Sequence, residues 1–235
     1  MLLRPFFWYY GGKWKIAPRY PTPGHDTIVE PFAGAAGYST RYHDRKVILF
    51  DKSPYVVGVW NFLIKSSEKC ILSLPDIPPS GDLSDLVVCQ EARWLIGYWT
   101  GAGDAHPRQR ISSSWFRRDR RAPRGYWCDR VRQRLANQVR YIRHWAIKEA
   151  SYLDAPNMNA TWFIDPPYAR SGKRYLFASS IDYAHLAHWS RERRGTSIVC
   201  EQVGADWLPF VPLVTTSSVA NKPSAECVFV CRNKE

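Results

Sequence analysis

Residues 27–37 read TIVEPFAGAAG, and this stretch decides the fold class. Thr27-Ile28-Val29 is β-branched and predicts a short strand, which breaks into a small-residue turn. After a short helix, the apolar run from Lys46 to Asp51 predicts a second, buried strand that ends in an acid. Val56 to Lys65 is typical of a helix. This order predicts an α/β domain built on a parallel, Rossmann-like sheet with helices on both faces.

The same alternation returns in the last third of the chain. Thr161 to Asp165 predicts a buried strand that ends at Pro166-Pro167-Tyr168. Asp182 to Arg193 predicts an amphipathic helix, and Thr196–Cys200 and Glu226–Cys231 predict two more strands. We therefore expect one sheet whose two parts are separated in sequence by a segment of another kind.

The separating segment is strongly basic. Between Asp104 and Lys148, thirteen Arg and Lys residues stand against three acids, so this segment contributes +10 of the chain's formal net charge of +12. Its second half, Asp129 to Lys148, has apolar residues at helical spacing and predicts a helix. Its first half mixes arginines with aromatic residues and predicts loop or hairpin. Such an excess of positive charge is typical of a nucleic-acid partner, although a merely basic surface is the simpler alternative.

The chain of 235 residues, 45% of them hydrophobic, is long enough for one α/β domain with an insertion. Leu74 to Ser84, rich in Pro, Gly and Asp, predicts a linker. We expect three parts: residues 1–82, a small, basic, mainly helical insertion at residues 83–152, and residues 153–235. The sequence has no membrane-length apolar run and no signal-peptide cleavage pattern, which predicts a cytoplasmic protein. The six cysteines form no Cys-x-x-Cys pair, so we expect no metal site and no disulfide framework.

Three strand ends carry residues with chemical potential, and ligands of parallel sheets bind at such ends. The turn at Glu30-Pro31-Phe32-Ala33-Gly34 would let a ligand approach the backbone, or is simply a tight turn. Asp51 follows Gly34 by seventeen residues, where a carboxylate can bind ribose hydroxyls; it could equally cap the next helix.

Asp165-Pro166-Pro167-Tyr168 is the strongest of the three motifs. Its two prolines fix the backbone and offer no N–H groups, so the Asp165 carboxylate and the Pro166 carbonyl can both accept hydrogen bonds from one amino group. Such acceptors would localise the lone pair of an adenine amino nitrogen toward a methyl donor, and Tyr168 could stack on the base. An isolated Asp-Pro-Pro is often only a turn, but here Tyr168 follows it and a buried strand precedes it.

Taken in order, these motifs resemble those of the Dam-type DNA adenine methyltransferases, which use S-adenosylmethionine. Tyr9-Tyr10-Gly11-Gly12-Lys13 resembles the family's N-terminal aromatic-x-Gly-Gly-Lys segment, and Glu30-Pro31-Phe32-Ala33-Gly34 resembles its cofactor turn. Asp51 falls where the family's acid binds ribose, and Asp165-Pro166-Pro167-Tyr168 is its catalytic tetrapeptide unchanged. The resemblance covers most of residues 1–65 and 155–235 in the motif order of the alpha group. The basic segment occupies the family's target-recognition position.

The resemblance implies a methyltransferase that transfers a methyl group from S-adenosylmethionine to the N6 amino group of adenine in double-stranded DNA, with the target base flipped out. It implies catalytic roles for Asp165, Pro166, Pro167 and Tyr168. It implies cofactor-binding roles for Tyr9, Gly11, Gly12, Lys13, Glu30, Pro31, Phe32, Gly34, Asp51 and Asp165. Two departures stand out: Gly34-Ala35-Ala36-Gly37 shifts one glycine relative to the family's usual Gly-Ala-Gly, and Tyr9 stands where Trp is frequent.

We expect the basic segment to bind DNA phosphates, and its aromatic residues to stack on bases or insert between them. We select as candidate DNA-binding residues Arg117, Arg118, Arg120, Arg121, Arg124 and Arg132. Three alternatives stay open: methylation of adenosine in RNA, methylation of cytosine N4 in DNA, and a DNA-binding protein without catalysis. A short enzyme of this kind suits a bacterial cell, phage or prophage.

Overall fold

The computed structural model describes residues 1–101, 104–111, 126–217 and 223–233. They contain a seven-stranded sheet in the order β3-β2-β1-β4-β5-β7-β6. Strands β3, β2, β1, β4 and β5 are parallel, and β7 is antiparallel to both of its neighbours, β5 and β6. The strands are β1 (Thr27–Glu30), β2 (Lys46–Asp51), β3 (Ala146–Glu149), β4 (Ala160–Ile164), β5 (Gly195–Gln202), β6 (Val211–Ser217) and β7 (Pro223–Asn233).

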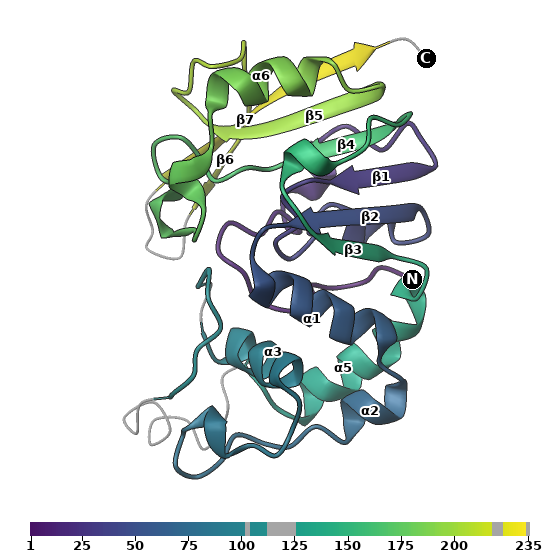
Figure 1. Cartoon of the computed structure of the whole chain (residues 1–235), viewed down its shortest axis with the longest axis vertical. Helices are drawn as coiled ribbons and strands as arrows, with labels where there is room; N and C mark the ends of the chain where they lie inside the picture. The colour runs from purple at the N-terminus through teal and green to yellow at the C-terminus, as the bar shows by residue number, and fades with distance from the viewer. Residues whose placement is uncertain (102–103, 112–125, 218–222, 234–235) are drawn as a thin grey trace.

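Helices pack on the sheet, and several of them lie beyond its β3 edge (Figure 1). The described α-helices are α1 (Pro54–Lys65), α2 (Glu68–Leu72), α3 (Gln90–Thr100), α5 (Asp129–Val139) and α6 (Tyr183–Arg191). Short 3-10 turns lie at Ala17–Arg19, Ser39–Tyr42, Leu83–Asp85, Arg140–Ile142, Tyr152–Asp154, Gly172–Arg174 and Ala178–Ser180. In Figure 1, α2, α3 and α5 lie together below the β3 edge, with α1 between them and the sheet.

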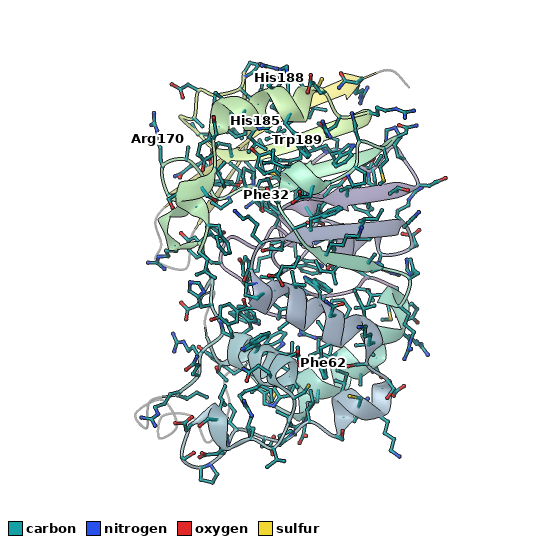
Figure 2. The ribbon with its side chains drawn as sticks, viewed as in Figure 1. Phe32, Phe62, Arg170, His185, His188 and Trp189 are labelled. Atoms are coloured by element: carbon teal, nitrogen blue, oxygen red, sulfur yellow. The ribbon has the colours of Figure 1, made fainter. Side chains whose placement is uncertain are left out.

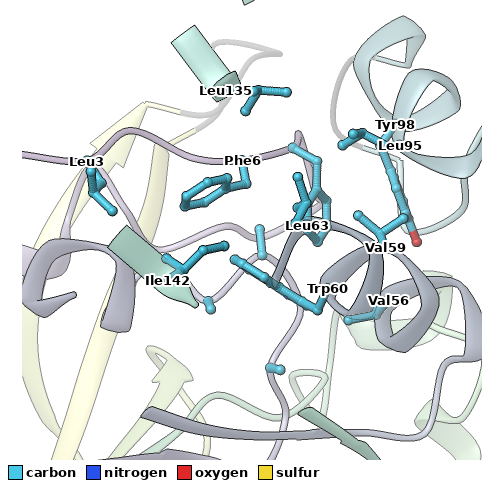
Figure 3. Close-up of a cluster of buried hydrophobic side chains, with 14 of the residues drawn as sticks. Leu3, Phe6, Val56, Val59, Trp60, Leu63, Leu95, Tyr98, Leu135 and Ile142 are labelled. Carbon is cyan, nitrogen blue, oxygen red and sulfur yellow. The ribbon is translucent and has the colours of Figure 1, made fainter. Parts of the chain in front are cut away.

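Successive side chains of each strand point to opposite faces of the sheet, so each face has a core of its own. On one face, Val29 and Trp162 pack against Leu186 and Trp189 of α6. On the other face, Ile28 shares a core with α1 and with the N-terminal segment. Figure 3 shows this second core, where N-terminal side chains meet those of α1, α3 and α5. Its labelled members are Leu3, Phe6, Val56, Val59, Trp60, Leu63, Leu95, Tyr98, Leu135 and Ile142.

The α/β class and the strands predicted at residues 27–29, 46–51, 161–165, 196–200 and 226–231 are confirmed to within a few residues. The helix predicted over Asp129–Lys148 is wrong beyond Val139. The chain makes a 3-10 turn there and then forms β3, which pairs in parallel with β2 at the edge of the sheet. This strand lies within residues 83–152, so that range includes a part of the sheet as well as helices. No helix among the described ranges is long and apolar enough to cross a membrane.

Candidate functional site

A pocket of about 290 Å³ lies where the strand order reverses, between the carboxyl ends of β1 and β4. A parallel sheet leaves a crevice at this point because its connections run in opposite directions from the two strands. The turn after β1, the acid that ends β2 and the first residue after β4 all line it. Figure 2 shows Phe32 and His185, which line this pocket, well separated from Phe62 on α1.

All ten residues expected on the cofactor side line this one pocket. They come from the N-terminal loop, the turn after β1, and the ends of β2 and β4, and they are Tyr9, Gly11, Gly12, Lys13, Glu30, Pro31, Phe32, Gly34, Asp51 and Asp165. Of the four residues expected to be catalytic, Asp165 and Pro167 line the pocket. Pro166 and Tyr168 are not among the lining residues: Pro166 is buried, and Tyr168 is half-buried next to Lys13.

Asp51 fastens the turn after β1 to the end of β2. Its Oδ2 accepts a hydrogen bond from the Gly34 N–H at 3.0 Å, and its Oδ1 accepts one from the Ser53 N–H at 2.8 Å. Burial raises the pKa of Asp51 to about 6, against the lowering effect of these N–H groups. The Ser53 side chain does not cap α1, and its buried Oγ makes no hydrogen bond with the described part of the chain.

The shifted glycine of the turn has a structural consequence. Gly34 has φ +45°, and a Cβ added to it would lie 2.9 Å from the Tyr9 ring. Ala36, which is not a glycine, also has φ +45° and is fully buried. A Cβ on Gly37 would lie 2.5 Å from the Trp14 backbone nitrogen. The turn therefore needs a bare backbone at residue 37 to let the N-terminal segment approach, and it bears strain at Ala36.

Lys13 and Asp165 form the charged centre of the site. The Lys13 Nζ lies 3.0 Å from the Asp165 Oδ1, with both side chains largely buried, and it also donates to the Gly11 carbonyl at 2.9 Å. Burial raises the pKa of Asp165 to about 6, although Lys13 lowers it. Burial lowers the pKa of Lys13, but the charges of Asp165 and Glu226 outweigh burial and raise it above its ordinary value. At neutral pH the pair is therefore an ammonium beside a carboxylate.

The Asp165 carboxylate retains unused acceptor capacity. Apart from the ion pair with Lys13, its buried Oδ1 accepts no well-directed hydrogen bond from the described residues. A buried carboxylate oxygen is costly in that state, so it favours a ligand that donates hydrogen bonds. Tyr168, three residues on, has the Lys13 ammonium 4.7 Å from its ring centroid, which occupies one ring face.

The segment after Tyr168 crosses the pocket and was not anticipated as part of the site. Tyr175 donates a hydrogen bond from its hydroxyl to the Tyr10 carbonyl at 2.9 Å, which ties this segment to the N-terminal loop. Phe177 lies under the Lys52 ammonium, 4.9 Å from its ring centroid, next to the end of β2. The aromatic residues that follow the Asp-Pro-Pro-Tyr motif were the available sequence signal.

Two further side chains complete the pocket wall on the α6 side. The Tyr152 hydroxyl and the His185 Nδ1 share a hydrogen bond of 2.9 Å, and the Tyr152 ring lies against Phe32 at 5.4 Å between centroids. His185 is held at this position by the start of α6, where Asp182 caps the helix by accepting from the His185 N–H. The pocket thus combines an aromatic side with four acidic side chains, those of Glu30, Asp51, Asp165 and Asp182, which suits a ligand that carries both a ring and polar groups.

The expectation for Arg132 requires a correction. Its guanidinium is buried and pairs with the carboxylates of Asp76 and Asp129, and it lies over the Trp127 ring. A cation neutralised twice by its own chain is not available to a DNA phosphate. The other five candidate DNA-binding residues, Arg117, Arg118, Arg120, Arg121 and Arg124, lie outside the described residues.

Comparison with known proteins does not supply a function. No model of a known protein family matches the chain, and no curated protein is significantly similar to it. Within the described residues, no group of three or more His, Cys, Asp or Glu side chains could hold a metal ion.

Proposed function

We propose that the protein is an S-adenosylmethionine-dependent DNA methyltransferase that acts on the N6 amino group of adenine. One observation carries the proposal: Lys13, Asp51 and Asp165, together with the turn at Gly34, line a single pocket at the switch point of the sheet. These residues come from separate motifs, and the parallel sheet brings the strand ends that carry them to one crevice. The proposed reaction uses DNA in the cytoplasm of a bacterial or phage-infected cell.

The cofactor side of the pocket fits S-adenosylmethionine. Asp51 ends β2, where a carboxylate can accept hydrogen bonds from ribose hydroxyls. The buried Ser53 Oγ, which has no hydrogen-bond partner among the described residues, offers another polar contact nearby. Gly34 lets the Tyr9 ring pack closely on the turn, and the rings of Phe32 and Tyr152 offer an apolar surface for a purine. When bound, S-adenosylmethionine supplies the electrophilic methyl group.

Asp165 is the group that would act on the target amine. Its unused carboxylate lone pairs accept a hydrogen bond from the exocyclic amino group, and the Pro166 carbonyl accepts a second one. The amino group loses a proton when its nitrogen gains the methyl group. A carboxylate with its pKa raised to about 6 is a better acceptor for that proton than an ordinary aspartate. Lys13 keeps the buried Asp165 ionised near neutral pH because its ammonium compensates the negative charge.

Mass spectrometry of nucleosides tests this proposal. Unmethylated DNA is incubated with the protein and S-adenosylmethionine, and N6-methyladenine is quantified beside Asp165→Asn, which keeps the shape and removes the charge. We expect a loss of about 100-fold or more in that variant. Asp26→Asn is the matched control, because Asp26 is a fully exposed carboxylate just before β1, at the opposite end of the strand. It should methylate as the wild type does.

The same assay separates the alternatives. N4-methylcytosine in place of N6-methyladenine would keep the chemistry and change the target base. Methylation of RNA but not of DNA of matched sequence would reassign the substrate. A folded protein that binds S-adenosylmethionine but methylates neither polymer would refute the proposed activity.

A further inference from the structure

Glu226, a buried carboxylate on β7, contacts Tyr168 beside the site. Glu226 is 8% exposed, although its neighbours along β7, Ala225 and Cys227, are apolar. Its Oε2 accepts a hydrogen bond from the Tyr168 hydroxyl and another from the Tyr20 hydroxyl, the latter at 3.3 Å. A carboxylate buried among apolar side chains costs several kcal/mol unless such partners compensate it, so the position serves a purpose other than core packing.

The hydrogen bond from Tyr168 completes a chain of contacts that leads to Asp165. The hydroxyl end of the Tyr168 ring is fixed by Glu226, and one face of the ring lies 4.7 Å from the Lys13 ammonium. That ammonium is in turn 3.0 Å from Asp165. The Lys13 ammonium therefore contacts both the Tyr168 ring and the Asp165 carboxylate.

We propose that Glu226 is a positioning residue of the target-base site, which holds the Tyr168 ring against the Lys13–Asp165 ion pair. The inference rests on the proposed function, because it assigns Glu226 a part in presenting the target amine to Asp165. It concerns a residue outside every motif of the sequence. β7 is the only antiparallel neighbour of β5 within the described sheet, and through Glu226 it reaches a site otherwise built from parallel strand ends and loops.

Glu226 has two separable effects. As an acceptor it fixes the ring of Tyr168, and a neutral amide oxygen could do the same. As a charge it raises the pKa of Asp165 and helps to raise that of Lys13. The titratable groups that act on the Asp165–Lys13 pair from the neighbouring elements are Glu226, Glu201, Glu30, Cys200, Tyr9, Tyr20, Tyr168 and Tyr175.

Two substitutions separate these effects. Glu226→Gln keeps an acceptor and removes the charge, whereas Glu226→Leu removes both. Tyr20→Phe is the matched control: it removes the other hydroxyl bound to the same carboxylate but leaves Tyr168 attached. For each variant, kcat, KM for DNA and the pH dependence of kcat/KM are measured with saturating S-adenosylmethionine, after circular dichroism and thermal melting confirm the fold.

The expected results differ between the variants. Glu226→Leu should lower kcat about 10-fold, the equivalent of one buried hydrogen bond, while the affinity for S-adenosylmethionine stays within about twofold. Glu226→Gln should keep most of kcat and move the acid limb of kcat/KM to lower pH, because removal of a nearby negative charge lowers the pKa of Asp165. Tyr20→Phe should change neither. Equal losses in Tyr20→Phe and Glu226→Leu, or an unmoved acid limb in Glu226→Gln, would overturn the proposal.

A spectroscopic arm keeps this inference distinct from the proposed activity. Tyrosine labelled with ¹³C at Cζ gives one resonance for each phenol, and the Tyr168 signal is identified by its loss in Tyr168→Phe. It should shift in Glu226→Leu and much less in Tyr20→Phe. A wild type without methyltransferase activity refutes the proposed function. An unshifted Tyr168 resonance in Glu226→Leu instead refutes the role of Glu226.

Discussion

Replacement of Lys13 by methionine should destabilise the protein in a pH-dependent way. Methionine fills a similar volume, so the main change is that Asp165 loses the ammonium 3.0 Å from its Oδ1. The two side chains are only 6% and 19% exposed, so water replaces little of the lost interaction. Removal of one partner of a buried ion pair costs about 3–5 kcal/mol when the other partner stays charged.

The pH dependence follows from the pKa of Asp165. In the wild type this pKa is about 6, and it rises further when Lys13 no longer lowers it. Well below pH 6, Asp165 is neutral, and the variant loses only the contacts of Lys13 with the Gly11 carbonyl and the Tyr168 ring. A raised carboxyl pKa in the folded state favours folding at low pH, and this contribution is lost as the pH rises through the folded pKa. The loss of stability should therefore be up to about 2–3 kcal/mol larger at pH 8 than at pH 5, since each of the two pH units between the wild-type pKa and pH 8 contributes at most about 1.4 kcal/mol.

Urea unfolding at pH 5 and pH 8 measures this difference. Lys13→Arg, which keeps the charge, and the double variant Lys13→Met with Asp165→Asn are the controls. The double variant should recover most of the stability at pH 8, since it leaves no buried charge without a partner. A destabilisation of equal size at both pH values, or a double variant as unstable at pH 8 as the single one, would refute the reasoning.

Four further predictions concern other parts of the molecule. Gly37→Ala should weaken S-adenosylmethionine binding about 10-fold or more in calorimetry, because its Cβ would displace the backbone at Lys13 by contact at 3.0 Å; unchanged affinity would contradict this. Ala36→Gly should leave stability unchanged or raise it by up to about 1 kcal/mol in thermal unfolding, since relief of the strain at φ +45° offsets the entropy of glycine. A clear loss would show that no strain exists there. Glu30→Gln should stabilise the protein at pH 9 relative to pH 6, because burial raises the pKa of Glu30 to about 8 and ionisation above that value disfavours the folded state; urea unfolding without such a difference would count against it. Arg132→Met should alter stability and leave the salt dependence of DNA binding unchanged, whereas a shallower salt slope would restore its role at phosphates.

The strand ends were predictable because their signals are local. Each of β1, β2 and β4 is a short apolar run that stops at an acid or at proline. The apolar run identifies the strand, and the acid or proline identifies its end. Since the ends of parallel strands meet at one edge, the sequence also indicated that Asp51 and Asp165 lie together.

The rest depends on contacts between distant residues. β3 is a four-residue edge strand with mostly exposed side chains, so it lacks the apolar alternation that would distinguish it from the end of a helix. Arg132 has the sequence surroundings of a DNA-binding arginine, and only the fold shows that Asp76 neutralises it. Glu226 stands in an ordinary strand sequence, and its contact with Tyr168 arises from the pairing of β5 with β7.

The N-terminal segment has a consequence for biosynthesis. Its residues supply one wall of the pocket, yet Tyr10 is bound by Tyr175, which is 165 residues later in the chain. Lys13 likewise meets its counter-ion only when β4 has been made. The rings of Phe6 and Phe7, by contrast, pack against Trp60 and Tyr98, so they can be covered once α1 and α3 have emerged from the ribosome. The pocket is therefore among the last features to form, and translation products that end before β4 should lack it.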